Sequence, residues 1–267
     1  MLSYMPTTPV ALLTVVAAFF LVTTAVALAL GYGLESVWKR RIWALPLDPG
    51  QTGAELRGNV IFIIVNTLVL TIVLATGAIR VGPDDVVSAT ATFFAFFAAF
   101  QVWFYAMHRT LHHRHFVRFH RHHHLSRVTT PLSGQSSGWV ESLGWAVGYA
   151  GLPVLLSYVH PISLVGVGAY LVFNIIGNIV GHANIEVVPT SSTLWWRSTM
   201  ATVFTYHALH HARWTGHFGF ASTWADRLLG TEWADWPALH RRVWNGAPLT
   251  SLKEKGTTTA TTTTTTT

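Results

Sequence analysis

Long apolar runs alternate with short polar, basic segments along this chain. Each of five runs approaches the roughly 20 residues that an α-helix needs to cross a bilayer. The runs cover residues 10–30, 58–79, 86–107, 143–159 and 162–181. The fourth is short and contains Pro153, so we expect a kinked or incompletely inserted helix there. The pattern predicts an all-α integral membrane protein of about four to five spans.

The composition supports a membrane protein with one domain. Half of the residues (51%) are hydrophobic and 10% are charged, whereas soluble domains carry about 25% charged residues. The last two runs are separated only by His160 and Pro161, which predicts a tight C-terminal hairpin. Nothing resembles a soluble module with its own core, so residues 1–256 are expected to form a single membrane-embedded catalytic domain. Residues 257–267 are almost pure threonine and are expected to be a disordered tail.

Basic residues predict the orientation of the spans. Of the 17 Lys and Arg residues, all but Arg80 lie between runs one and two, after run three or after run five. The positive-inside bias then places the N-terminus outside and the C-terminus in the cytoplasm. The first run lacks a basic leader and is long enough to span, so no cleaved signal peptide is expected. Because this bias explains the positive charge, we expect no nucleic acid partner.

Fifteen histidines and no cysteine are the chain's most distinctive chemical feature. Most fall into four clusters on the predicted cytoplasmic side, which read HRTLHH (108–113), HRHHH (120–124), a lone His182, and HALHH (207–211). On a helix, positions i, i+3 and i+4 share a face, so each longer cluster can direct two or three imidazoles at one point. With His182 this gives nine nitrogens, which is too many for one tetrahedral zinc and suits two metal ions of higher coordination number.

Such a site favours oxygen chemistry at a membrane edge. Neutral imidazole suits iron, copper, zinc and nickel. A histidine-rich pair of metals carries little negative ligand charge, so it can cycle iron between oxidation states and activate O2, which side chains cannot do unaided. The absence of cysteine excludes disulfides, thiolate-ligated haem and cysteine-bound iron–sulfur clusters. The clusters begin where runs three and five end, so an apolar substrate can enter from the lipid.

Three of these clusters, in this order and spacing, resemble the histidine boxes of the fatty acid hydroxylase and sterol desaturase superfamily of integral-membrane di-iron oxygenases. HRTLHH resembles the first box, HRHHH the second and HALHH the last, while GHAN resembles the lone histidine that leaves the last membrane hairpin. The segment FGFASTWADRLLGT resembles the family's closing segment. The resemblance extends from about residue 103 to residue 231.

The resemblance implies a fold, a chemistry and a set of metal ligands. The fold is a helical membrane protein with a cytoplasmic, histidine-rich di-metal cap. The cofactors are two iron ions, replaceable by zinc in purified protein, and O2 is the co-substrate. The reaction is hydroxylation or desaturation of a membrane lipid such as a sterol or fatty acyl chain, with electrons from a cytochrome b5-like or ferredoxin/reductase partner. The implied ligands are His108, His112, His120, His123, His124, His182, His207, His210 and His211.

Five further residues are candidates for additional or supporting roles, and no catalytic residue beyond the metal ligands is expected. His113 competes with His112 for the first box, and the i+4 spacing from His108 favours His112. His217 stands where many family members have Asn, and Glu186 where some have a second histidine. His217 is either a ligand or a neighbour of one, whereas Glu186 is a ligand, a neighbour of one, or uninvolved.

Glu141 and Asp226 complete these candidates. Glu141 lies near the start of the fourth run, where an acid is either an interfacial helix-start residue or the partner that orients a ligand histidine. Asp226 belongs to the closing segment and has the same two interpretations.

Two other functions fit parts of the pattern. A divalent transition-metal transporter, or another metal-binding membrane protein, would also need histidines, but transporters usually carry polar ligands within their spans. A membrane zinc protease would need H-E-x-x-H, which is absent. The identity of the lipid and the oligomeric state do not follow from the sequence.

Overall fold

The computed structural model describes residues 8–189 and 203–256, and every regular element within them is a helix. Four long helices are α1 (Pro9–Val37), α2 (Gln51–Ala75), α3 (Val86–Leu111) and α7 (Leu164–Gly181). A fifth long segment, Trp139–Val159, combines α5 (Trp139–Ala146), the π-helical turn η3 (Val147–Gly151) and α6 (Leu152–Val159). All five are long and apolar enough to cross a membrane. The predicted all-α class with five candidate spans is confirmed.

The fourth span contains a change of helix type rather than a break. Pro153 lies in the first turn of α6, directly after η3. Proline has no N–H and its ring crowds the preceding turn, so a wider π turn accommodates it within a continuous helical segment. Only the loop 160–163 separates α6 from α7, and the predicted hairpin is therefore present.

Several helix ends differ from the hydropathy pattern for identifiable reasons. Helix α2 starts at Gln51 rather than at residue 58, because its first turns carry buried polar side chains with partners elsewhere in the chain. Glu55, for example, accepts hydrogen bonds from the hydroxyls of Ser126 and Thr130 at 2.7 and 2.8 Å. The helix ends at Ala75, and Gly77 follows with φ of +65°, a left-handed conformation that favours glycine after a helix.

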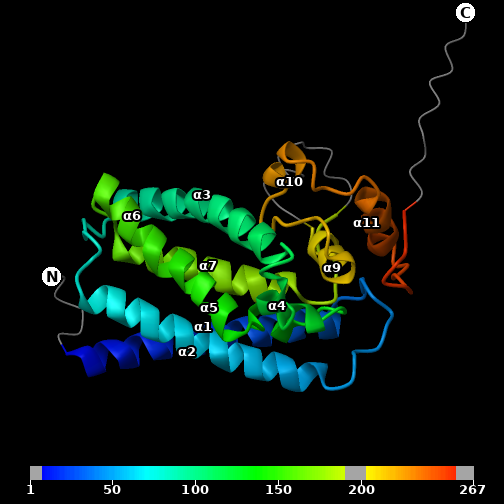
Figure 1. The fold of residues 1–267 in the computed structure, drawn as a ribbon, viewed down its shortest axis with the longest axis horizontal. Coiled ribbons are helices and arrows are strands. Elements are labelled where there is room, and N and C mark those ends of the chain that lie inside the picture. Colours follow the sequence, from blue (N-terminus) through cyan, green and yellow to red (C-terminus); the bar gives the residue numbers. More distant parts are fainter. Residues whose placement is uncertain (1–7, 190–202, 257–267) are drawn as a thin grey trace, which may run out of the picture.

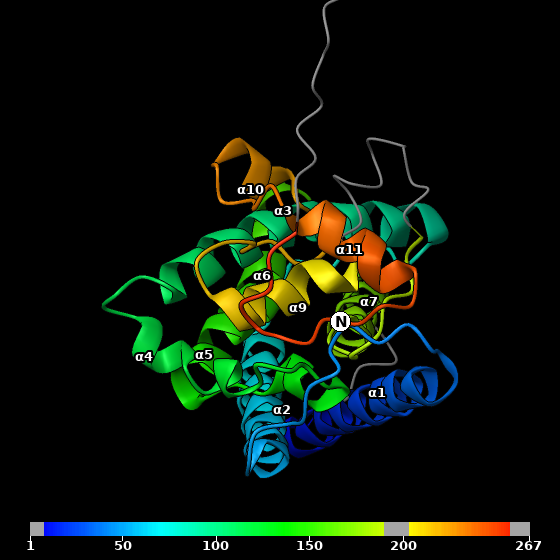
Figure 2. The same cartoon turned by 90° about the vertical axis from the view of Figure 1, so that its right-hand side faces the viewer.

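The five long segments alternate in direction along the bundle (Figure 1). The C-terminal ends of α1, α3 and α7 therefore meet the N-terminal ends of α2 and α5 at one end of the molecule. Short helices cover that end (Figures 1 and 2). They are α4 (Val117–His120), η1 (His123–Leu125), η2 (Pro131–Gln135), α9 (Phe204–Arg213), α10 (Trp224–Leu228) and α11 (Trp236–Trp244).

The bundle of long helices and the cap of short helices each have their own apolar core. Phe20, Phe96, Tyr170 and Ile175 are fully buried where the long helices pack together, and a second apolar cluster, which includes Leu209, lies within the cap. The cap is thus a packed layer on the bundle rather than a set of loose loops. The predicted threonine tail lies outside the described residues, as does Arg197.

Candidate metal centre

The first histidine box lies at the cap end of α3. His108 is in the last turn of the helix and His112 follows directly after it, so the i, i+4 spacing brings their rings to 5.1 Å between centroids. Nδ1 of His108 donates a hydrogen bond to the carbonyl of Phe218 at 2.7 Å. This bond fixes the ring and leaves Nε2, which is buried without a hydrogen-bond partner. His113 is exposed and contacts His115 and Phe116 instead.

The second box does not lie on one regular helix. His120 ends α4, and His123 begins the 3-10 turn η1. Helix α2 holds the chain that follows this box. Gln51 donates to the carbonyl of Val128, and Asn59 to that of Leu132. These contacts and the Glu55 hydrogen bonds make α2 the support for the second box.

The remaining ligand candidates come from α7 and α9. His182 directly follows α7, and its Nδ1 donates to the carbonyl of Asn178 at 2.6 Å. Helix α9 carries His207, His210 and His211, all buried. Nδ1 of His210 donates to the carbonyl of Gly216 at 2.6 Å.

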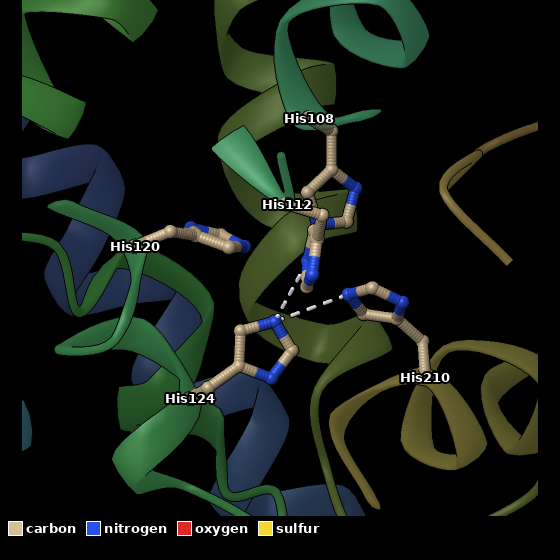
Figure 3. A group of neighbouring side chains, drawn as sticks. All are labelled: His108, His112, His120, His124 and His210. Carbon is tan, nitrogen blue, oxygen red and sulfur yellow. Dashed lines mark hydrogen bonds between the residues drawn. The ribbon is translucent and has the colours of Figure 1, made fainter. Parts of the chain in front are cut away.

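The nine predicted ligands converge into two groups, in each of which the potential ligand atoms lie within 4.8 Å of one another. The five-histidine group, drawn in Figure 3, is His108, His112, His120, His124 and His210. The four-histidine group is His123, His182, His207 and His211. The prediction that each box can aim at a single point is confirmed for the first box, whose two histidines share one group, and is wrong for the second box and the α9 box, which each contribute to both groups. Neither group includes a carboxylate among the described residues.

The spacing of the nitrogens fits a metal ion in each group. Metal–imidazole bonds are about 2.0–2.1 Å long, so two ligands at a right angle are about 3 Å apart. In the five-histidine group, Nε2 of His124 lies 3.1 Å from Nε2 of His112 and 3.2 Å from that of His210. In the other group, Nε2 of His207 lies 3.0 Å from that of His182 and 3.2 Å from that of His211.

Protonation states agree with metal binding. Burial lowers the pKa of His182 to about 4, and burial together with the neighbouring His108 lowers that of His112 to about 2. Desolvation, followed by the adjacent histidines, holds the pKa of His124 and of the three α9 histidines well below the ordinary value. Their rings are therefore neutral at pH 7, which is the form that binds metal.

Glu141 adjoins the five-histidine group. It lies in the first turn of α5, fully buried, and accepts a hydrogen bond from Nδ1 of His120 at 2.8 Å. Nε2 of His120 has no hydrogen-bond partner. Of the two interpretations open from the sequence, contact with a candidate ligand is the one observed. Asp226 supports His108 indirectly. It accepts hydrogen bonds from the backbone N–H groups of Phe218 and Gly219, and so holds in place the Phe218 carbonyl that accepts the hydrogen bond of His108.

His217 and Glu186 lie outside both groups. Nδ1 of His217 donates to the carbonyl of Tyr206, and its Nε2 accepts from the backbone N–H of Trp233, each at 3.0 Å. Both ring nitrogens are therefore occupied. Glu186 accepts hydrogen bonds from the N–H and hydroxyl of Thr205, at 2.9 and 2.7 Å. It thus caps the first turn of α9 and positions the helix that carries three ligand candidates.

A small pocket of about 20 Å³, room for roughly one water molecule, lies beside both histidine groups. Histidines of both groups line it together with the apolar side chains of Phe62, Phe104 and Trp145. Gln135, Ser137, Glu141 and Asn178 add polar atoms. Sequence reasoning missed Gln135, Ser137 and Asn178, because they lie outside the boxes and carry no ionisable group. The pocket therefore borders both histidine groups and residues of the long helices.

Comparison with known proteins agrees with this geometry. A family model described as fatty acid hydroxylase matches residues 93–231, just over half of the chain. Protein CER1-like 2 of Arabidopsis thaliana is 31% identical over 133 residues, which are 48% of this chain and 21% of that protein. Very-long-chain aldehyde decarbonylases GL1-4 of Oryza sativa subsp. indica and CER1 of Arabidopsis thaliana are 29% and 28% identical, with the same coverage. The matched region thus spans about a fifth of these relatives. No solved structure matches.

Proposed function

The chain belongs to the fatty acid hydroxylase family, and on that premise we propose that it is an O2-dependent di-iron membrane oxygenase that hydroxylates a C–H bond of a lipid. The observation that carries the proposal is the separation of nine imidazoles into groups of five and four, with nitrogen spacings that suit one metal ion each. A single structural zinc needs four ligands, which does not account for this number. Iron is favoured over zinc because the reaction of the family needs a redox-active metal.

The chain's own residues would prepare the site in three ways. Nδ1–H hydrogen bonds from His108, His120 and His210 fix the tautomer that turns Nε2 toward the metal. Burial keeps the imidazoles neutral and excludes water, which protects the oxidant from wasteful reduction. The bound iron pair would supply O2 activation, which side chains cannot provide. Phe104 and Trp145, which line the small pocket together with histidines of both groups, would contact the hydrocarbon of a substrate that reaches the site.

The overall reaction balances as RH + O2 + 2 e⁻ + 2 H⁺ → ROH + H2O, so two electrons must be supplied for each turnover. Desaturation uses the same inputs but removes a second hydrogen from the substrate and sends both oxygen atoms to water. Incubation with 18-O2, a reductant and host membrane lipids distinguishes the two outcomes. Hydroxylation places the label in the lipid, whereas desaturation leaves the lipid unlabelled. Substrate conversion that continues without O2 would contradict both.

A long-chain aldehyde is a second candidate substrate. Two relatives are named very-long-chain aldehyde decarbonylases, and the polar atoms of Gln135, Ser137 and Asn178 in the pocket suit an oxygen-bearing chain end. Incubation with a C18 or longer aldehyde tests this alternative. An alkane product one carbon shorter would favour it, and a hydroxylated product of the same chain length would favour the hydroxylase.

A further inference from the structure

The segment between α3 and η1 forms a strongly basic surface beside the five-histidine group. Residues 109–121 contain no acidic residue. Four arginines in this segment are exposed, and we refer to them as the arginine surface: Arg109, Arg114, Arg118 and Arg121. In Figure 2, which looks onto the cap end, the segment joining α3 to α4 projects outward from the body.

The arginines of the described residues differ in whether they form an ion pair with a carboxylate. Arg127, Arg213, Arg227 and Arg242 each form an ion pair with a carboxylate. Within the described part of the chain, none of the four surface arginines has a carboxylate within 4.0 Å. Their observed contacts are with neutral groups: Arg109 donates to the hydroxyl of Tyr105, and Arg118 lies over the ring of Phe119. Four positive charges are therefore free to bind an acidic partner.

Trp214 packs against the five-histidine group, next to the histidine box from which the basic segment continues. It directly follows α9, and its ring centroid lies 4.3 Å from that of His124 and 6.2 Å from that of His112. Its φ of +69° is left-handed, which is a strained conformation for a bulky residue and one that accumulates at functional positions. The side chain is only partly buried. Trp214 thus places an aromatic ring between two ligand candidates and the exterior.

The candidate metal centre comes nearest to the surface at His112, which contacts the ring of Trp214. His112 is partly exposed, whereas the other eight ligand candidates are buried. It lies three residues from Arg109 and two from Arg114, within the basic segment. Electron transfer through protein slows steeply with distance, so an electron donor bound here has a short path to the metals.

We propose that the arginine surface and Trp214 together form the docking site of an acidic one-electron carrier protein, a proposal that rests on the oxygenase function above. Each of two reduced carriers gives up one electron here and leaves oxidised, which supplies the two electrons of the balanced reaction. Tryptophan and arginine are the residue types that contribute most to binding at protein interfaces. Anionic lipid headgroups would also bind arginines, but they give no reason for a strained tryptophan over two ligand candidates.

Binding measurements test the docking surface directly. The probes are the soluble haem domain of a cytochrome b5 and a plant-type [2Fe–2S] ferredoxin, both acidic, with the enzyme in nanodiscs of neutral phosphatidylcholine. The double variant Arg114→Glu/Arg118→Glu should weaken binding of at least one carrier by roughly tenfold or more, and added salt should weaken wild-type binding. The control is Arg241→Glu, which changes an exposed arginine on α11, on the other side of α9, and should change the affinity by less than about twofold.

Three results would overturn the docking surface. One is that neither carrier binds the wild-type enzyme, and another is that the double variant and Arg241→Glu weaken binding equally. The third is that charge reversal alters only the binding of the protein to vesicles containing phosphatidylserine, which would assign the arginines to lipid headgroups.

Variants of Trp214 test the electron path separately from binding. Trp214→Gly removes the ring and also relieves the left-handed strain, so the variant should fold and keep its metals, while Trp214→Phe keeps an aromatic ring. Oxidation of the bound, reduced carrier, divided by the rate of single turnover of the same variant after reduction by dithionite, should fall at least about fivefold in Trp214→Gly and recover largely in Trp214→Phe. Equal carrier oxidation in wild type and Trp214→Gly would overturn the role of Trp214. Absence of dithionite-driven turnover in the wild type would instead refute the oxygenase function.

Discussion

Nδ1 of His120 donates a hydrogen bond to the carboxylate of Glu141 at 2.8 Å, and both side chains are buried. The pair links the cap, through α4, to the first turn of the fourth span. Nε2 of His120 remains for a metal, and the arrangement matches the carboxylate–histidine–metal triads in which an outer carboxylate orients the ligand. The indole of Trp145 donates to the same carboxylate oxygen at 3.3 Å.

Glu141→Leu should weaken metal binding to the five-histidine group by about 10–100-fold, because His120 loses the acceptor that holds its ring. Glu141→Gln keeps an acceptor oxygen at the same position and should retain more of the affinity. Competitive titration with a metal chelator, followed by elemental analysis, measures both variants. Wild-type affinity in Glu141→Leu would show that the hydrogen bond does not support the metal.

His217 should support the fold and not the metals, because hydrogen bonds occupy both ring nitrogens. His217→Ala should reduce stability by about 1–3 kcal/mol, since it leaves backbone groups without partners, yet metal content should stay at the wild-type level. His217→Asn should be milder, because asparagine tolerates the φ of 58° found here. His210→Ala is the matched ligand variant and should lose metal. Metal loss in His217→Asn would make His217 a ligand after all.

The sequence predicts which histidines converge better than it predicts how they divide into two groups. Residues His108 and His112 follow helical spacing, so their convergence is a local property of α3. The division of the α9 box, with His210 in one group and His211 in the other, depends on which neighbouring element each ring faces. Such tertiary packing leaves no trace in residue spacing.

The sequence also leaves the roles of supporting residues open. Glu186 and His217 are buried polar groups next to family motifs, and no spacing rule separates a ligand from a residue that binds backbone. Their partners, Thr205 for the first and Trp233 for the second, are set by the packing of α9 and the chain after it. Similarly, hydropathy located the spans but missed the first turns of α2, where Gln51 and Glu55 are stabilised by contacts with each other and with the chain that follows the second box.

The orientation predicted from basic residues gives a direct labelling experiment, because the chain has no native cysteine. His115→Cys lies in the exposed basic segment, and Val86→Cys lies at the opposite end of α3, where the native side chain is 83% exposed. In intact cells, a membrane-impermeant maleimide should label Val86→Cys and should label His115→Cys only after permeabilisation. The reverse pattern would place the metal centre outside the cytoplasm.

Low pH should destabilise the metal-free protein. Burial lowers the pKa of His182 to about 4 and that of His112 to about 2, whereas both titrate near 6.5 in an unfolded chain. The unfolded state therefore binds more protons below pH 6.5, and stability that is present above 6.5 is lost as the pH falls. Each such histidine costs about 1.4 kcal/mol by one pH unit below 6.5.

Thermal unfolding of metal-free protein at pH 7.5, 6.5 and 5.5 measures this effect. The midpoint should fall from pH 7.5 to 6.5 and fall more steeply from 6.5 to 5.5, and His182→Asn should show a smaller fall because it removes one such group. A constant midpoint from pH 7.5 to 5.5 would mean that the histidines are not held neutral by burial.

The number of metal ions per chain tests the account most directly. Protein purified from iron-replete cells should contain close to two transition-metal ions per chain by elemental analysis. His124→Ala should leave about one ion, in the four-histidine group, and His211→Ala about one, in the five-histidine group. A folded wild-type protein with one ion or none, or a loss of both ions in each variant, would contradict two separate metal sites.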